Sequence, residues 1–311
     1  MAEYSNSFSK QFREDQEEFL NIAIKKWKFH KNFKRNLIIF SIIGIFLLVF
    51  AIIFLVYNLQ IVEKDVYYGS QCTKNELNCE IQIEISSDMT APIFVYYQLE
   101  NFYRRNRNYF KSKSVEQLKG NVDADLSNCG DYQTNSEMVK VQSYDGSTLK
   151  KSENAFPCGE IAYTYFTDTF KLKSSKGELI NIDESDIAWE SDREYNFKNP
   201  EGWEKFAWTN IEDEHFMVWM RTAGQGRLKK LWGRIKNDLV KGQYTLIVNN
   251  TYDEQLYSSD MVKSFFMTTT TIFGQKNMVL VGSYFAGAFI CLCSIIVLVV
   301  IYFRDKRRKI I

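Results

Sequence analysis

The sequence predicts a membrane protein in which two transmembrane α-helices flank one large, mainly antiparallel β domain, sandwich-like, with helical and loop extensions. Three observations predict this class. Two long stretches carry no charged residue, several short segments between them alternate apolar and polar side chains, and four cysteines lie between the stretches. The average composition, with 45% hydrophobic and 25% charged residues, conceals this division.

The two uncharged stretches cover residues 37–59 and 278–303. Each is longer than the roughly 20 residues that a helix needs to cross a hydrocarbon core of about 30 Å. The first stretch is too long and starts too late for the apolar region of a cleaved signal peptide, so we predict an uncleaved anchor. A buried core helix is the alternative, which the length disfavours.

Basic residues flank both stretches on their outer sides, at residues 25–35 and 304–309. Because Lys and Arg concentrate on the cytoplasmic side, we predict a cytoplasmic N-terminal segment over residues 1–36 and a cytoplasmic tail over residues 304–311. Residues 60–277 are then translocated as an exoplasmic or lumenal domain. The net charge of the whole chain is +1, which argues against a nucleic-acid partner.

Both predicted cytoplasmic ends carry a further pattern. Apolar residues recur from Phe19 to Trp27 at helical spacing, with basic residues opposite them. This pattern predicts a basic amphipathic helix on the anionic lipid surface, and a solvated flank is the alternative. The last four residues, RKII at 308–311, are similar to a dibasic retrieval signal, and a plain positive tail is the alternative.

Four of the six cysteines fall in the translocated segment, where an oxidising lumen favours disulfides. Of the three possible pairings we predict the sequence neighbours, Cys72 with Cys79 and Cys129 with Cys158. Free buried thiols are an alternative, and a zinc site is disfavoured because the segment has one histidine and no C-x-x-C pair. Asn249 begins the chain's Asn-Asn-Thr glycosylation sequon.

Short segments of the translocated region favour strands. Residues 81–85 alternate Ile with polar residues, and residues 93–99 are rich in aromatic and β-branched side chains. Residues 178–182 and 242–249 have similar patterns, whereas residues 102–110 are irregular or helical in pattern. Short strands without regular helices between them are typical of an antiparallel domain.

Few residues offer enzyme chemistry, and we predict a non-enzyme without cofactor or metal. His30 and His215 are the chain's two histidines, and the predicted topology places them on opposite sides of the membrane. The chain has no G-x-S-x-G, P-loop or G-x-G-x-x-G motif. A lumenal enzyme that uses His215 in a nucleophile–histidine pair is an alternative, and the plentiful carboxylates also leave a glycosidase-like pair open. Neither span has an Asp, Glu, Lys, Arg or His side chain, which disfavours transport by this chain alone.

One long segment carries a family resemblance. It contains FMVWMRTA at residues 216–223 and RLKKLWGRI at residues 227–235. Other elements follow in the family's order, with YYQLENFY at residues 96–103, FPCGEIA at residues 156–162 and FGQKN at residues 273–277. On these motifs the sequence resembles the cell division control protein 50 family, also called the ligand-effect modulator family, over nearly the whole chain.

The resemblance implies a non-catalytic accessory (β) subunit that binds the α subunit of a type-IV P-type ATPase, a phospholipid flippase. It implies a role in endoplasmic-reticulum exit, stability and transport cycle of the ATPase, with aminophospholipid moved to the cytoplasmic leaflet. The membranes implied are the endoplasmic reticulum, the Golgi or endosome, and the plasma membrane. A free-standing receptor or adhesion ectodomain on a two-span anchor is the alternative. Nine residues of the matching elements are predicted partner-interface candidates: Asn101, Phe102, Tyr103, Trp219, Met220, Arg221, Thr222, Gly233 and Arg234.

Overall fold

The computed structural model describes residues 33–102, 107–222, 227–253 and 260–308. The chain divides into two compact units, and one of them is Ile61–Gln275. The other unit holds the two long helices. The predicted amphipathic helix and the last residues of the predicted retrieval signal lie outside the described residues.

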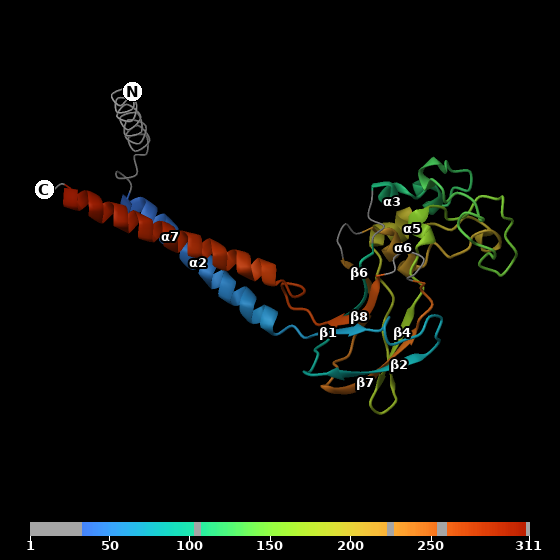
Figure 1. Cartoon of the computed structure of the whole chain (residues 1–311), viewed down its shortest axis with the longest axis horizontal. Coiled ribbons are helices and arrows are strands. Elements are labelled where there is room, and N and C mark those ends of the chain that lie inside the picture. The colour runs from blue at the N-terminus through green and yellow to red at the C-terminus, as the bar shows by residue number, and fades with distance from the viewer. Residues whose placement is uncertain (1–32, 103–106, 223–226, 254–259, 309–311) are drawn as a thin grey trace, which may run out of the picture. The chain divides into compact units, whose positions relative to one another are not determined.

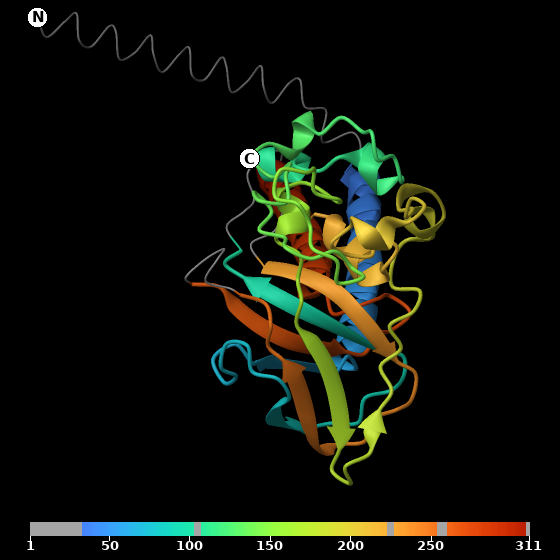
Figure 2. The ribbon, with the colours of Figure 1, turned by 90° about the vertical axis from the view of Figure 1, so that its right-hand side faces the viewer.

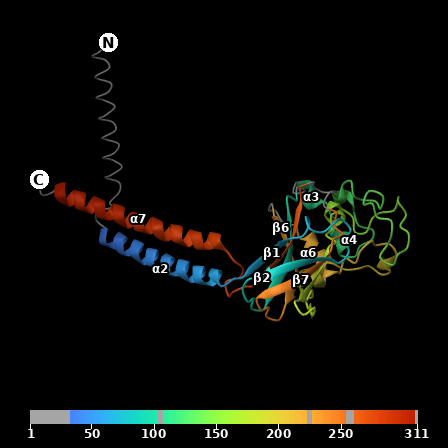
Figure 3. The same ribbon diagram turned by 60° about the horizontal axis from the view of Figure 1, so that its bottom comes forward.

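The helices α2 (Phe33–Leu59) and α7 (Met278–Arg308) run antiparallel, side by side, in Figures 1 and 3. Both are long and apolar enough to cross a membrane. They approach closely at small residues, since a Cβ added to Gly44 would lie 3.1 Å from the Cβ of Cys291. Close backbone approach of this kind lets helices pack in lipid, where apolar burial alone supplies no driving force.

Side chains join the two helices at both ends. At one end the ring of Phe33 stacks on that of Tyr302, with centroids 4.5 Å apart. At the other end the backbone N–H of Asn277 donates to Oδ1 of Asn58 at 2.5 Å. The side chain of Asn277 accepts from the backbone N–H of Leu280 at 2.9 Å, and it thus caps α7.

The second unit is built on two four-stranded antiparallel sheets, which Figure 2 shows from the side. The first sheet has the order β1-β8-β3-β6, with β1 at Glu63–Tyr67, β8 at Val262–Thr268, β3 at Ile93–Glu100 and β6 at Arg227–Ile235. The second has the order β2-β7-β4-β5, with β2 at Cys79–Ile85, β7 at Gly242–Asn249, β4 at Thr169–Ser174 and β5 at Leu179–Ile180. The predicted fold class is confirmed.

The two sheets meet in an aromatic core. The ring of Phe170 on β4 lies 5.2 Å from that of Phe265 on β8 and 5.1 Å from that of Trp232 on β6, measured between centroids. Tyr97 on β3 stacks on Phe166 at 3.9 Å. Alternate residues of a strand point to opposite faces, so period-two patterns such as that of β2 send one set of side chains into this core.

Helices and loops gather at one end of the sandwich (Figures 1 and 2) and form the predicted extensions. They include α3 (Arg107–Lys111), α4 (Val115–Leu118), η2 (Ser127–Cys129), α5 (Glu160–Tyr163), η3 (Asp192–Asn196), η4 (Trp203–Lys205) and α6 (Glu214–Met220).

Most of the expected strands are present. The segments at residues 81–85, 93–99 and 242–249 lie within β2, β3 and β7. The segment at 178–182 contains only the two residues of β5, and the segment at 102–110 contains the start of α3. Both long helices extend beyond their uncharged stretches, since α2 begins at Phe33, before the first stretch, and α7 continues past the second stretch to Arg308.

Candidate functional site

The signature segment folds into the short helix α6 and the strand β6. Asp213 caps α6, because its carboxylate accepts the backbone N–H of His215 at 2.9 Å. Trp219 is buried, and its indole Nε1 donates to the carbonyl oxygen of Ile161 at 2.7 Å. The indole also packs edge-on against Phe102, 6.0 Å between centroids. Trp219 therefore fixes α6 to the sandwich.

Two lysines satisfy the carbonyl groups at the C-terminal end of α6. Nζ of Lys230 donates to the carbonyl oxygen of Val218 at 2.7 Å and to that of Arg221. Nζ of Lys113 donates to the carbonyl oxygen of Met220 at 3.3 Å. The last carbonyls of a helix have no intrahelical partner and carry partial negative charge, which these ammonium groups offset. Burial, assisted by the charges of Lys113 and Arg221, lowers the pKa of Lys230 to about 7.

Arg221 forms a bidentate ion pair with Asp192. Its Nε donates to Oδ2 at 2.7 Å and its Nη2 to Oδ1 at 2.6 Å. The side chain of Arg221 is 52% exposed and that of Asp192 only 2%, so the pair links the surface to the interior. Burial raises the pKa of Asp192, but hydrogen bonds from Arg221 and Asn196 outweigh this and leave the pKa lowered.

Large aromatic side chains are exposed next to this ion pair. Trp189 is 71% exposed and Tyr195, on the same short helix as Asp192, is 70% exposed. The guanidinium carbon of Arg221 lies 5.9 Å from the centre of the Trp189 ring. The few residues that dominate binding at protein interfaces are enriched in Trp, Tyr and Arg. We name Trp189, Tyr195 and Arg221 the aromatic patch.

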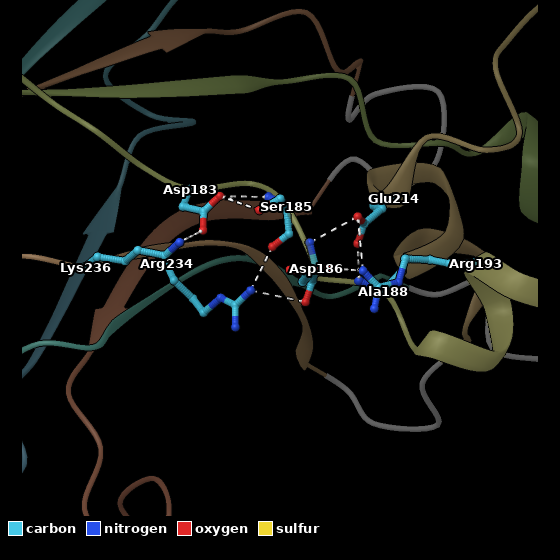
Figure 4. A network of polar contacts seen from close by, with 8 residues as sticks. All are labelled: Asp183, Ser185, Asp186, Ala188, Arg193, Glu214, Arg234 and Lys236. Carbon is cyan, nitrogen blue, oxygen red and sulfur yellow. Dashed lines mark hydrogen bonds and ion pairs between the residues drawn. The ribbon is translucent and has the colours of Figure 1, made fainter.

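Residues 182–188 form a strap along β6, which Figure 4 shows from close by. Asp183 and Arg234 exchange both backbone hydrogen bonds, each at 2.8 Å. Nη2 of Arg234 also donates to the carbonyl oxygens of Ser185 at 2.8 Å and Asp186 at 3.3 Å. The signature arginine therefore holds the strap through its backbone and its side chain.

The glycine that precedes Arg234 makes this approach possible. A Cβ on Gly233 would lie 2.9 Å from the carbonyl oxygen of Asp183 and 2.7 Å from the side chain of Ile182.

The carboxylate of Asp183 is itself held by an ion pair, since Nζ of Lys236 lies 2.7 Å from it. Hydrogen bonds from Lys236 and Ser185 hold the pKa of Asp183 well below its usual range.

The far end of the strap is held by α6 (Figure 4). The carboxylate of Glu214 accepts the backbone N–H of Asp186 at 3.0 Å and that of Ala188 at 2.8 Å. Arg193 forms an ion pair with Asp186. The strap thus connects β6, α6 and η3 into one polar network beside the aromatic patch.

His215, the residue on which an enzyme alternative depends, packs beside this strap. Its Nε2 lies 3.0 Å from the carboxylate of Glu184, and its ring stacks on Trp232 with centroids 4.0 Å apart. The structure brings no hydroxyl or thiol from the described residues into hydrogen-bond contact with this ring. Within the described ranges, no group of three His, Cys, Asp or Glu residues is placed to hold a metal ion.

The nine predicted interface candidates divide between interior and surface. Four are buried, so they support the domain from within: Phe102, Trp219, Met220 and Gly233. Three are exposed, namely Asn101, Arg221 and Thr222, and Arg234 is half-buried. Tyr103 lies outside the described residues. The patch residues Trp189 and Tyr195 were not among the nine, because sequence alone does not reveal which aromatic side chains stay exposed.

The cysteines of the domain form two disulfides. Cys72 is joined to Cys79 and Cys129 to Cys158, which is the expected pairing of sequence neighbours. Asn249, the first residue of the sequon, ends β7 and is half-buried. Its glycosylation stays a prediction.

The sandwich also contains a buried ion pair that was not predicted from the sequence. Lys263 on β8 is 1% exposed, and its Nζ lies 3.1 Å from the carboxylate of Asp168, which is fully buried. That carboxylate also accepts the hydroxyl of Tyr68 at 2.8 Å and the backbone N–H of Tyr252 at 2.6 Å. The sequence of β8 could have indicated a buried lysine, because the alternation of side chains in a strand places Lys263 on the same face as Phe265.

Comparison with known proteins shows which family this sequence matches. The family model described as "LEM3 (ligand-effect modulator 3) family / CDC50 family" matches residues 63–309. "ALA-interacting subunit 3" of Arabidopsis thaliana is 32% identical over 74% of this chain, and the match spans 65% of the relative, just under two thirds. "Cell cycle control protein 50A" of Mus musculus is 28% identical over 84% of this chain and 81% of the relative.

The family match covers the whole of α7 and most of the β domain, and within that domain it includes α6, β6 and the strap. The resemblance in the signature motifs and the family model therefore agree on the same residues. The chain belongs to the LEM3/CDC50 family, and its two long apolar helices make it an integral, two-span membrane protein.

Proposed function

We propose that this chain is the non-catalytic accessory (β) subunit of a type-IV P-type ATPase that moves phospholipid across a membrane. The observation that carries the proposal is the family match over residues 63–309. Its Arabidopsis thaliana relatives are themselves named as interacting subunits. The paired helices offer a surface on which further membrane helices can pack.

The aromatic patch is the proposed contact on the translocated domain. Arg221 is exposed while its partner Asp192 is buried, so the guanidinium is held in one position before a partner arrives. Trp189 and Tyr195 supply large exposed aromatic surface, and Tyr195 lies on the short helix that also carries Asp192. Preorganised aromatic and arginine side chains lose little conformational entropy on binding, which favours affinity.

The finer parts of the proposal come from the charge pattern and the resemblance. Both termini are cytoplasmic, and residues 60–277 are exoplasmic or lumenal and carry a glycan on Asn249. The subunit supports exit of its ATPase from the endoplasmic reticulum, its stability and its transport of aminophospholipid. The complex works in the Golgi, endosome or plasma membrane.

A pull-down from cell membranes in mild detergent tests the assignment. The tagged wild-type chain is expected to recover a P-type ATPase in near-stoichiometric amount, identified by mass spectrometry. Recovery of none would reject the accessory-subunit assignment and favour a free-standing receptor.

The same pull-down tests the patch. Trp189→Ala with Tyr195→Ala is expected to reduce recovery strongly, because both side chains are exposed and little folding energy depends on them. Leu179→Ala is the matched control, since Leu179 is 63% exposed on β5. Equal recovery by the double variant and the control would show that the contact lies elsewhere on the domain.

A further inference from the structure

A tight turn near the C-terminal end of the β domain exposes two apolar side chains. Thr271 and Gly274 exchange backbone hydrogen bonds at 3.0 and 2.9 Å, which closes the turn. Gly274 has a φ of +90°, a conformation that glycine adopts without strain. The two residues at the tip, Ile272 and Phe273, are 80% and 44% exposed.

Covalent connection keeps this tip close to the start of α7. Phe273 precedes Met278, the first residue of α7, by five residues. Five extended residues span at most about 18 Å, so the tip cannot lie farther than this from the first residue of the membrane helix.

Hydrogen bonds to Val62 also keep the start of this turn close to the end of α2. The backbone N–H of Thr269 donates to the carbonyl oxygen of Val62 at 3.0 Å, and the N–H of Val62 donates to Oγ1 of Thr269 at 2.9 Å. Val62 follows Leu59, the last residue of α2, by three residues. Three residues reach at most about 11 Å. The base of the turn is therefore tethered to both membrane helices.

From these observations we infer that the turn at residues 271–274 is a lipid-contact site, in which Ile272 and Phe273 enter the interface of the adjacent leaflet. Apolar side chains held out toward solvent cost free energy, and this cost is relieved in the headgroup and acyl-chain boundary. Side chains can bury about 5–10 Å into this boundary without crossing the membrane.

A site-specific fluorophore on the full chain tests the inference. The purified chain, with Cys291→Ala and Cys293→Ala to remove the two free cysteines, carries Ile272→Cys labelled with a polarity-sensitive dye in phosphatidylcholine vesicles. The control label is at Val262→Cys, which is 36% exposed at the opposite end of β8 from Thr268. These two ends of the strand are about 20 Å apart.

The expected result is a blue-shifted emission at position 272, quenching by nitroxide-labelled phospholipid and protection from aqueous iodide, with the reverse at 262. Phe273→Asp added to the 272 label is expected to abolish the lipid quenching while the domain stays folded. A 272 label that iodide quenches as strongly as the 262 label, or that neither quencher reaches, overturns the inference. No ATPase is present, so the outcome is independent of the proposed function.

Discussion

The helix pair and the β domain are both rich in apolar residues, yet they are held together differently. In the helix pair the close contacts involve small residues, as where Gly44 meets Cys291. The β domain instead encloses a complete ion pair, Asp168 with Lys263. Burial from water stabilises the domain enough to offset the desolvation of two charges, whereas lipid offers the helices only the gain from close packing.

Removing one charge of the buried pair should give the largest effect. Lys263→Met leaves the carboxylate of Asp168 buried without its cation, which costs about 3–5 kcal/mol. Urea unfolding of the full chain in detergent, followed by tryptophan fluorescence, measures this because five of the six tryptophans lie in the β domain. Lys263→Met combined with Asp168→Asn should be less destabilising than Lys263→Met alone, and a loss below about 1 kcal/mol for the single variant would contradict the interpretation.

The two disulfides should differ in the stability they supply. Cys129–Cys158 closes a loop with a sequence separation of 29, against 7 for Cys72–Cys79. Replacing both cysteines of the longer loop by Ser should cost about 3–4 kcal/mol, and those of the shorter loop about 2 kcal/mol. The same urea titration makes the comparison. Equal losses, or a greater loss from the shorter loop, would show that the loop-length argument does not govern this domain.

Glycine substitutions test the comparison directly. Gly233→Ala places a Cβ 2.9 Å from a backbone carbonyl oxygen, which cannot move without displacing the strap, and should cost about 1–3 kcal/mol. Gly287→Ala meets only the end of the Leu47 side chain at 3.0 Å and should cost less than about 1 kcal/mol. Hydrogen exchange of residues 182–188 should rise in the first variant alone. Unchanged exchange would mean that Gly233 does not determine the position of the strap.

The last prediction concerns the pH dependence of stability. The pKa of Lys230 falls from an ordinary value of 10.5 to about 7 in the folded chain, so between these values the unfolded chain binds more protons. Its contribution to the free energy of unfolding therefore rises with pH across this window, by at most about 1.4 kcal/mol per pH unit. Lys230→Met removes this contribution. If wild type and variant keep a constant stability difference from pH 7 to 9, the lowered pKa is wrong.

Sequence patterns predicted the elements whose physics is local or periodic. The long uncharged stretches predicted α2 and α7, and alternation or strand-favouring composition predicted β2, β3 and β7, because each of these signals lies within one short segment of the chain. The pattern did not predict strand β6, since its lysines at 229 and 230 are typical of a solvated segment. Only the folded domain supplies the helix end that receives Lys230.

The candidate site shows the same limit. Family motifs identified Trp219, Arg221 and Arg234, but the partners of these residues are far away in sequence. Arg221 contacts Asp192, and Arg234 contacts the strap at residues 183–186. No spacing rule connects these positions, because tertiary packing alone brings them together.

The pairing of β1 with β8 has a consequence for biosynthesis. These strands come from opposite ends of the domain's sequence, and β8 also supplies the neighbour of β3. Until the ribosome has released β8, two strands of the first sheet have no partner along those edges. The sandwich must therefore complete its folding late in synthesis, and until then the nascent chain exposes unpaired strand edges, a kind of surface on which aggregation can start.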